Sequence, residues 1–360
     1  MKNILTLLTT AGLLAAATAQ AQVEFYITGS TAFRANAYRS IRALYGANLV
    51  SQNPADSSGT PNVNQVTFSG TLPALFGGQT VTIRTAYNGS AAGVQAVAQN
   101  LNLTFLANAT PAGDTNTMSH QADLAFSDVF QAATAFISPS LDNTNVGVQP
   151  FVYVKSLGTA ANVTNITFQQ LQALLPNGVL PLSYFTGNSA DDTKYIFLVG
   201  RDSGSGTRIT AEKDALFLGS ELEYAPDTNC VWNIFSGFSS GSGITGVLNG
   251  SCGSTTNAVG YLGLSDAKNV NSGGNIVTYD GTLPYRGLVA APDFTPTRKG
   301  IYSLWGYEHL YQRTTASANL KSFRTAFSGE IENDLATSTT AIQVSSMGVK
   351  RSFDGGPITP

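Results

Sequence analysis

A loop rich in glycine, serine and arginine carries the strongest chemical signal in the sequence. It spans Gly200–Arg208 and reads GRDSGSGTR. Glycines let a backbone approach a ligand closely, and serine and threonine hydroxyls can cap a helix and donate hydrogen bonds. The side chain of Arg201 adds a planar, permanently charged fork that suits a tetrahedral oxyanion. These residue types in this order indicate a site for an anion.

The segments on either side of this loop would place it at the start of a helix. Tyr195–Val199 is apolar and typical of a buried strand, and Ala211, Ala215 and Leu218 recur at helical spacing. The first N–H groups of a helix have no partner within it and lie at the positive end of its dipole. The alternative is a flexible surface turn with an incidental arginine, and the loop lacks the Gly-Lys-Ser/Thr ending of a nucleotide P-loop.

Two further junctions of the same kind occur earlier in the chain. In the first, residues 23–28 form a strand, Gly29–Ala32 a loop, and the helix that follows bears Phe33, Ala37, Ile41 and Leu44 on one face. We expect the arginines elsewhere on that helix, Arg34, Arg39 and Arg42, to be solvated. In the second, the strand Val81–Tyr87 leads through residues 88–90 into a helix that carries Val94, Val97 and Leu101.

Strands that alternate with helices predict an α/β fold whose strands end at a common cleft. The apolar segment Ala122–Phe126 also ends in polar residues, Ser127 and Asp128. Val148–Val154 reads as a strand that could cross between lobes, and Phe168–Leu175 as a short amphipathic helix. Three helix N-termini and one arginine could then converge on a single anion. The polar segment Gly46–Leu72 is interpreted as an insertion.

The first 21 residues are typical of a cleavable signal peptide. Lys2 supplies the positive end, residues 4–17 are apolar, and cleavage is expected after Ala21. No cysteine follows that site, so no lipid anchor is expected, and no segment is suited to span a membrane. Removal of Lys2 changes the net charge from -3 to -4, so there is no basic field for nucleic acid. We expect an exported protein.

The two cysteines, Cys230 and Cys252, lie close in the sequence of an exported chain. A disulfide that closes their Gly/Ser-rich loop is the favoured interpretation, with two separate thiols as the alternative. His120 and His309 are the only histidines and neither has a ligand spacing, so we expect no metal site and no cofactor.

Several segments resemble the phosphate-binding protein of bacterial phosphate ABC importers. Arg201–Thr207 resembles that family's Arg-x-x-Gly-Ser-Gly-Thr loop and is the most specific match. The other matches are its first phosphate loop, its serine-capped second loop, its Ala-Ser-Asp segment, its Gly-Tyr strand and its re-entry segment, at Gly29–Ala32, Tyr87–Val94, Ala125–Asp128, Ala258–Gly263 and Gly300–Trp305. In this order they cover most of the chain from Phe25 to Tyr311.

The resemblance implies a two-lobed periplasmic binding protein-like fold of type II, with the ligand in the cleft between lobes. Residues 22–148 with 266–360 would form one lobe and residues 149–265 the other. It implies a monomer that binds inorganic phosphate for an ABC importer complex in the membrane and catalyses no reaction. The implied ligand contacts are Ser30, Thr31, Ala32, Ser90, Asp128, Arg201, Ser205, Gly206 and Thr207.

The chain also departs from that family. Some members carry an aspartate where Ser203 stands, and Gly46–Leu72 and the tail after Leu335 have no counterpart. Asp128 has two interpretations. It could accept a hydrogen bond from a proton-bearing oxyanion and so select phosphate over sulfate, or it could cap the segment that follows it.

Two other functions fit parts of the sequence. Gly237–Gly241 matches the Gly-x-Ser-x-Gly pattern of serine hydrolases, with Ser239 as nucleophile, His309 as base, and Asp266 or Asp293 as third member. Chance matches are common in such a Gly/Ser run, and glycines interrupt the helix that should follow. A surface or sensing protein that keeps the binding fold without transport is the other alternative.

Overall fold

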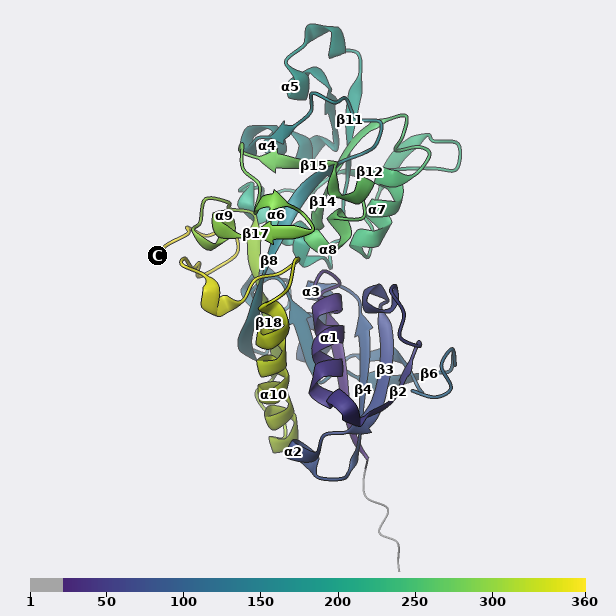
Figure 1. The fold of residues 1–360 in the computed structure, drawn as a ribbon. Helices are drawn as coiled ribbons and strands as arrows, with labels where there is room; N and C mark the ends of the chain where they lie inside the picture. The colour runs from purple at the N-terminus through teal and green to yellow at the C-terminus, as the bar shows by residue number, and fades with distance from the viewer. Residues whose placement is uncertain (1–21) are drawn as a thin grey trace, which may run out of the picture.

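The computed structural model describes residues 22–360, so the expected signal peptide lies outside the described residues. Two α/β lobes follow one another along the long axis of the molecule (Figure 1). Their strands join in one 12-stranded mixed sheet of order β10-β11-β14-β8-β18-β7-β1-β4-β3-β2, with β15 and β9 attached beside β8. The α/β fold expected from the sequence is confirmed.

The first lobe is built on three parallel strands. β1 (Val23–Gly29) lies between β4 (Thr80–Tyr87) and β7 (Leu124–Ser127). Because the three run in the same direction, their carboxyl ends meet at one edge of the sheet. Three helices pack on this sheet, α1 (Arg34–Tyr45), α3 (Ser90–Ala98) and α10 (Ala318–Leu335).

Aromatic side chains fill the core between this sheet and the helices α1 and α10. Phe25 of β1 stacks on Phe323 of α10, with ring centroids 4.0 Å apart. Phe33, Phe126 and Phe327 are fully buried beside them. Rings of this size bury a large apolar area, so they fix the sheet against both helices.

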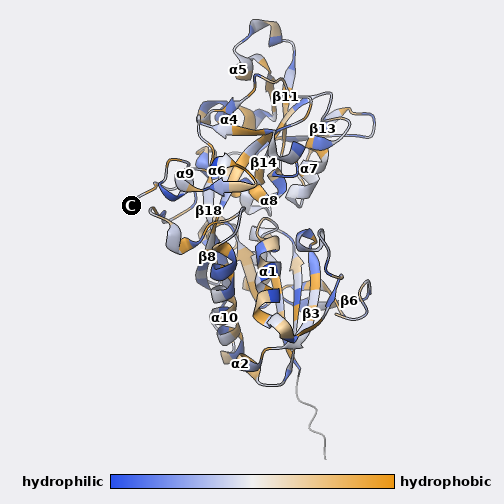
Figure 2. Cartoon of the chain, in the orientation of Figure 1, coloured by the Kyte–Doolittle hydropathy of each residue, from blue (hydrophilic) through white to orange (hydrophobic). Residues whose placement is uncertain are grey.

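The second lobe repeats the pattern. β11 (Tyr195–Val199) is parallel to β14 (Asn257–Gly263), and β10 (Val179–Pro181) lies at the edge. α6 (Gly206–Asp214) follows β11, and α4 (Phe168–Asn177) begins at Thr167 with a capping box. Hydrophobic residues concentrate in the sheet strands, for example at β14, whereas polar residues gather on outer elements such as α10 (Figure 2).

Two long antiparallel strands connect the lobes. β8 (Leu141–Lys155) pairs with β18 (Trp305–Arg313) along its first part and with β14 along its second. β15 (Ile276–Tyr279) also pairs with β8, next to β9 (Asn165–Ile166) in the second lobe. The division of the chain at residues 148–149 and 265–266 stays a prediction. Because β15 pairs with β9, the chain up to the start of β18 is counted with the second lobe below.

The segment 46–72 and the C-terminal tail both join the fold. The former contains β2 (Leu49–Asn53) and β3 (Gln65–Thr71), which extend the edge of the sheet beyond β4. The tail after α10 forms a bridge between Ile342 and Val148, and Arg351 donates to the carbonyl oxygens of Ser303 and Trp305, each at 2.8 Å. It thereby lies against the strands that connect the lobes.

Shorter elements complete the chain. They are α2 (Pro73–Phe76), β5 (Asn102–Leu106), β6 (Thr117–Gln121), α5 (Ser183–Thr186), β12 (Glu223–Pro226), β13 (Trp232–Phe235), α7 (Gly241–Asn249), α8 (Leu264–Ala267), β16 (Arg286–Leu288), β17 (Ala291–Asp293) and α9 (Thr295–Arg298). None of the described helices is long and apolar enough to cross a membrane.

The expected disulfide is confirmed. Cys230 and Cys252 are bonded, with Cα atoms 5.1 Å apart, and are 22 positions apart in sequence. The bond ties the loop between β12 and β13 to the segment after α7. Because bonds of this kind persist in oxidising compartments, it agrees with the expectation of export.

Two local predictions were wrong. The helix after the Gly200–Arg208 loop ends at Asp214, and Leu218 is 88% exposed instead of continuing its apolar face. Arg34, expected in solvent, is 3% exposed because α8 of the other lobe covers its side chain and Asp266 pairs with it.

Candidate anion-binding site

The loops of the three predicted junctions, together with Ser127–Asp128, meet where the two lobes contact each other. Gly29–Ala32, residues 88–90 and Ser127–Asp128 follow β1, β4 and β7, and the loop Gly200–Ser205 follows β11 of the other lobe. Across this junction the amide of Ala91 donates to the carbonyl oxygen of Gly204 at 3.0 Å. Gly89 lies against the same carbonyl at φ +105°, and a Cβ atom there would be 2.7 Å from that oxygen.

Arg201 is buried at the centre of this junction. Its Nε donates to the carbonyl oxygen of Phe238 at 2.9 Å, and its Nη2 to Ser239 O at 3.0 Å and to Thr31 Oγ1 at 3.2 Å. Only 3% of the residue is exposed, and no carboxylate of the described residues forms an ion pair with it. Burial lowers the pKa of Arg201, but a guanidinium keeps its proton in proteins. The site therefore contains a buried positive charge whose direct partners are neutral.

A hydrogen-bonded chain holds the backbone of Arg201 from behind. Its amide donates to the hydroxyl of Tyr261 at 3.1 Å, and that hydroxyl donates to Glu221 at 2.7 Å. Arg208 donates to the carbonyl oxygen of Arg201 at 2.9 Å and also to Glu212 at 2.8 Å. Both peptide groups of Arg201 are thus fixed, so its guanidinium is aimed across the junction before any ligand binds.

The N-terminus of α6 faces the same junction. Ser205 caps this helix, and its Oγ accepts from the amide of Arg208 at 3.3 Å. Gly206, the first residue of the helix, packs so closely on Asp128 that a Cβ atom would lie 1.7 Å from Asp128 Oδ1. Thr207 is buried beside them. The unpaired amides and positive dipole end of α6 therefore lie next to residues of the first lobe.

Asp128 is buried and accepts a hydrogen bond from the hydroxyl of Ser90 through its Oδ1. Burial raises the pKa of Asp128, whereas the Ser90 hydroxyl and the charge of Arg201 lower it. Its backbone amide is close to Ser90 Oγ, at 3.3 Å. The structure thus places both Ser90 and Asp128 at the junction, on elements of the first lobe.

The loop after β1 holds the remaining residues that were expected as ligand contacts. The amide of Ser30 donates to the carbonyl oxygen of Phe126 at 2.9 Å, while its buried hydroxyl has no partner among the described residues. The carbonyl oxygen of Ala32 accepts from Ser265 Oγ at 3.3 Å. All nine residues expected as ligand contacts, from Ser30 to Thr207, are therefore buried at one junction.

Ser203, which stands where some family members have an aspartate, is exposed. Its neighbour Asp202 accepts from the amide of Gly204 at 3.1 Å and so closes the turn of the loop. Neither side chain is a partner of Arg201. The second charged contact expected from the family pattern is therefore not formed by this loop.

The sequence did not place three ionisable residues of this junction, Arg34, Asp266 and Glu308, at the anion site. Arg34 Nη2 lies 3.5 Å from Asp266 Oδ1, and both residues are buried, so an ion pair links α1 to α8 across the lobes. Glu308 of β18 is fully buried next to the site. One signal in the sequence could have pointed to Glu308. It is the single acid in the stretch Trp305–Tyr311, which is otherwise uncharged and holds one neutral histidine.

The serine hydrolase constellation is not assembled. Ser239 is exposed and its carbonyl oxygen is taken by Arg201, whereas His309 is buried in β18 with its Nδ1 3.1 Å from Asn143 Oδ1. Burial lowers the pKa of His309 to about 3. Asp266 pairs with Arg34, and Asp293 hydrogen-bonds Thr295. No hydrogen bond joins any two of these residues within the described chain.

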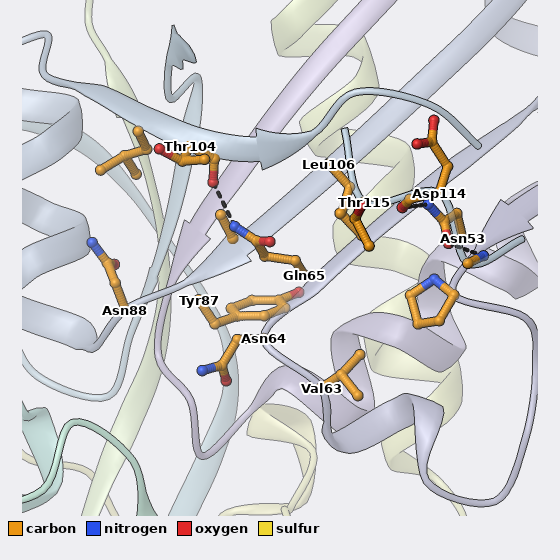
Figure 3. Close-up of a pocket in the computed structure, with 14 residues that line it drawn as sticks. Asn53, Val63, Asn64, Gln65, Tyr87, Asn88, Thr104, Leu106, Asp114 and Thr115 are labelled. Carbon is orange, nitrogen blue, oxygen red and sulfur yellow. Dashed lines mark hydrogen bonds between the residues drawn. The ribbon is translucent and has the colours of Figure 1, made fainter. Parts of the chain in front are cut away.

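A cavity of about 630 Å³ lies beside this site in the first lobe (Figure 3). It is bounded by β3, the end of β4 and the β5–β6 hairpin, and Gln65 reaches across it to the carbonyl oxygen of Thr104 at 2.7 Å. Asp114 is the only charged residue that lines it. Because it offers no cation, this cavity does not suit an anion, and the buried junction around Arg201 does.

Comparison with known proteins supports the fold. No protein-family model matches the sequence, and no curated protein matches it. Among solved structures, a putative phosphate ABC transporter substrate-binding protein with bound phosphate from Clostridium perfringens is 17% identical, with a TM-score of 0.56, over 89% of this chain and 99% of its own. An ABC-type phosphate transport receptor from Vibrio cholerae is 17% identical, with a TM-score of 0.50, over 89% and 99%. This chain therefore has the two-lobed fold of periplasmic substrate-binding proteins.

Proposed function

We propose that this protein binds inorganic phosphate between its two lobes. The observation that carries the proposal is Arg201, a buried guanidinium at the meeting point of four strand ends that has no ion-pair partner among residues 22–360. A buried charge is costly unless it is compensated. A small anion supplies that compensation, and the donors around Arg201 match its oxygen atoms.

The proposed contacts come from both lobes. Each is a hydroxyl group, a backbone amide at a helix start, the guanidinium or the carboxyl group, on Ser30, Thr31, Ala32, Ser90, Asp128, Arg201, Ser205, Gly206 and Thr207. Because the first lobe supplies five and the second four, bound phosphate would hold the lobes together. The solved Clostridium perfringens protein, which shares the fold, contains bound phosphate, and this agrees with the proposal.

Asp128 would make the site choose among tetrahedral anions. All other proposed contacts donate, so without it the site would accept any tetrahedral oxyanion. An ionised carboxylate only accepts, so it favours a ligand that still carries a proton and repels one that does not. Phosphate keeps a proton at neutral pH and sulfate does not. We therefore propose phosphate as the preferred ligand.

The likeness in fold also supports a proposal for the cellular role. We propose that the exported protein delivers phosphate to an ABC importer, as the names of both solved relatives say of those proteins. Phosphate uptake by cells with and without the gene tests this step. Unchanged uptake together with intact phosphate binding would favour the alternative, a surface or sensing protein.

The binding step is tested by calorimetry of the mature protein with phosphate, sulfate, arsenate and molybdate. We expect binding of phosphate and its close analogue arsenate, and much weaker binding of sulfate. As a matched control, Arg39→Ala removes an arginine that pairs with Asp334 on the outside of the first lobe, and it should bind phosphate like the parent. Absence of binding with all four anions would refute the proposal.

A further inference from the structure

Glu308 is a second acid beside the proposed anion site, and the strand register places it there. β7 and β18 are antiparallel, and their pairing ends with Ser127 opposite His309. The next residues on the two strands are Asp128 and Glu308. β1, the other neighbour of β7, ends just before Ser30. Three adjacent strands therefore bring Ser30, Asp128 and Glu308 to the same edge of the sheet.

The approach of β18 to Asp128 is close. A Cβ atom on Gly306 would lie 2.3 Å from the carbonyl oxygen of Asp128 and 3.6 Å from Thr210 Oγ1 of α6. Only a residue without a side chain fits here. This part of β18 is thus packed between the first lobe and the helix that follows the Arg201 loop.

Both carboxyl oxygens of Glu308 are without a hydrogen-bond partner among the described residues, although the residue is 0% exposed. The buried hydroxyls of Ser30 and Tyr87 also lack partners. Unpaired buried polar groups carry a large desolvation cost, so their concentration at one place points to a ligand that would pair with them.

The surroundings of Glu308 disfavour its charged form. Burial raises the pKa of Glu308 well above its usual value, and the nearby Asp128 raises it further. The Ser30 hydroxyl lowers this pKa, although it forms no hydrogen bond of normal geometry with the carboxyl group. The groups that face it are Ser30 after β1, Tyr87 of β4 and Asp128 after β7, and no cation is among them. On β18 itself, Tyr311 is a neutral phenol and His309 is a neutral imidazole. These surroundings therefore favour the protonated form of the carboxyl group.

We infer that Glu308 is a specificity-determining residue of the anion site, which donates a hydrogen bond from its carboxylic acid to the bound anion beside Ser30. The two acids then have opposite roles, because Asp128 accepts a hydrogen bond from the ligand and Glu308 donates one to it. Environments that separate the proton affinities of two neighbouring carboxyl groups assign such roles in other sites. This inference rests on the proposed phosphate site.

The consequence is an upper pH limit for binding. Loss of the Glu308 proton would remove a donor and place a second negative charge next to the anion. Phosphate binding by the wild type should therefore weaken at alkaline pH, and binding there should take up one proton. In Glu308→Gln the amide remains a donor and cannot ionise, so this weakening should disappear.

The test is calorimetry with inorganic phosphate from about pH 7 to about pH 10, a range that brackets the pKa values documented for buried glutamates. The wild type, Glu308→Gln and the control Glu330→Gln, which removes an acid from α10, are compared. We expect the first two to bind within about threefold of each other at neutral pH and to differ by about tenfold or more at the alkaline end, which is about one pKa unit of effect. The control should follow the wild type.

Wild-type titrations in two buffers of different ionisation enthalpy give the number of protons taken up, so the test does not depend on the variant folding. Identical pH profiles of wild type and Glu308→Gln, or no proton uptake by the wild type at alkaline pH, would overturn the role of Glu308 alone. Absence of phosphate binding at every pH would overturn the proposed function and this inference with it.

Discussion

Arg201 of the second lobe donates a hydrogen bond of 3.2 Å from its Nη2 to Oγ1 of Thr31 in the first lobe. The contact joins the loop after β11 to the loop after β1, so it exists only when the lobes are together. Its two members come from two of the loops whose sequences resemble phosphate loops. The guanidinium that would bind the anion therefore also forms a contact between the lobes that is present only when they are closed.

Replacement of Arg201 tests the charge at the centre of the site. Arg201→Ala removes a charge-assisted donor, and such bonds contribute about 1.5–3 kcal/mol, so phosphate affinity should fall by about tenfold or more. Thr31→Val removes one proposed hydroxyl contact and the acceptor of one Arg201 hydrogen bond, but it leaves the charge in place and should have a smaller effect. Calorimetry gives both values. An unchanged affinity of Arg201→Ala would show that Gly200–Arg208 is only a turn.

The selectivity assigned to Asp128 can be measured as a ratio. Asp128→Asn keeps the shape of the side chain, removes its charge and adds a donor. It should weaken phosphate binding modestly and strengthen sulfate binding, so the ratio of the two affinities should fall. If the wild type already binds sulfate as well as phosphate, or if the ratio does not change in the variant, Asp128 is a structural cap.

The close contact between Gly206 and Asp128 predicts that even a methyl group there is harmful. Gly206→Ala would place a Cβ atom 1.7 Å from Asp128 Oδ1, so the lobes could not approach as they do. We expect weaker phosphate binding with a nearly unchanged melting temperature. Gly329→Ala is the matched control, because that glycine lies in α10 with open space around it. Equal affinity of both variants would mean that this contact does not limit binding.

The C-terminal tail predicts a pH-dependent contribution to stability. Asp354 accepts a hydrogen bond from the amide of Phe130 at 2.8 Å, and burial raises the pKa of Asp354 to about 7. The folded protein therefore holds this proton at pH values where the unfolded chain, with an ordinary aspartate pKa, has lost it. Its contribution to the free energy of unfolding is complete at low pH and is lost as the pH rises toward about 7.

Asp354→Asn removes this titration and keeps an oxygen that can accept from Phe130. The free energy of unfolding of the wild type, measured relative to this variant by urea denaturation, should thus decrease between about pH 4 and about pH 7. At neutral pH the free energy of unfolding of the variant should therefore be higher, relative to that of the wild type, than it is at low pH. A difference that stays constant over this range would show that Asp354 is ionised in the folded protein.

Local patterns in the sequence predicted much of the fold, and the family resemblance supplied the nine contacts of the proposed phosphate site. The strand Tyr195–Val199 was placed without error, because a continuous apolar run between polar segments fixes a buried strand. The strand–Gly/Ser–helix junctions and the Cys230–Cys252 bond are likewise local, since both depend on residues close together in the chain. Leu218 was wrongly assigned to the helix, because the spacing of apolar residues alone does not reveal where a helix ends.

The tertiary structure decided which charges are buried and what lies beside the site. Arg34 and Asp266 are 232 positions apart, 266 less 34, and their pairing depends on how α1 of one lobe meets α8 of the other. Glu308 faces Asp128 only because β18 returns antiparallel beside β7. Sequence patterns record the period of each element but not which elements become neighbours. The residue types that could bind an anion were thus evident from the sequence, whereas the protonation and pairing of the acids around them follow from packing.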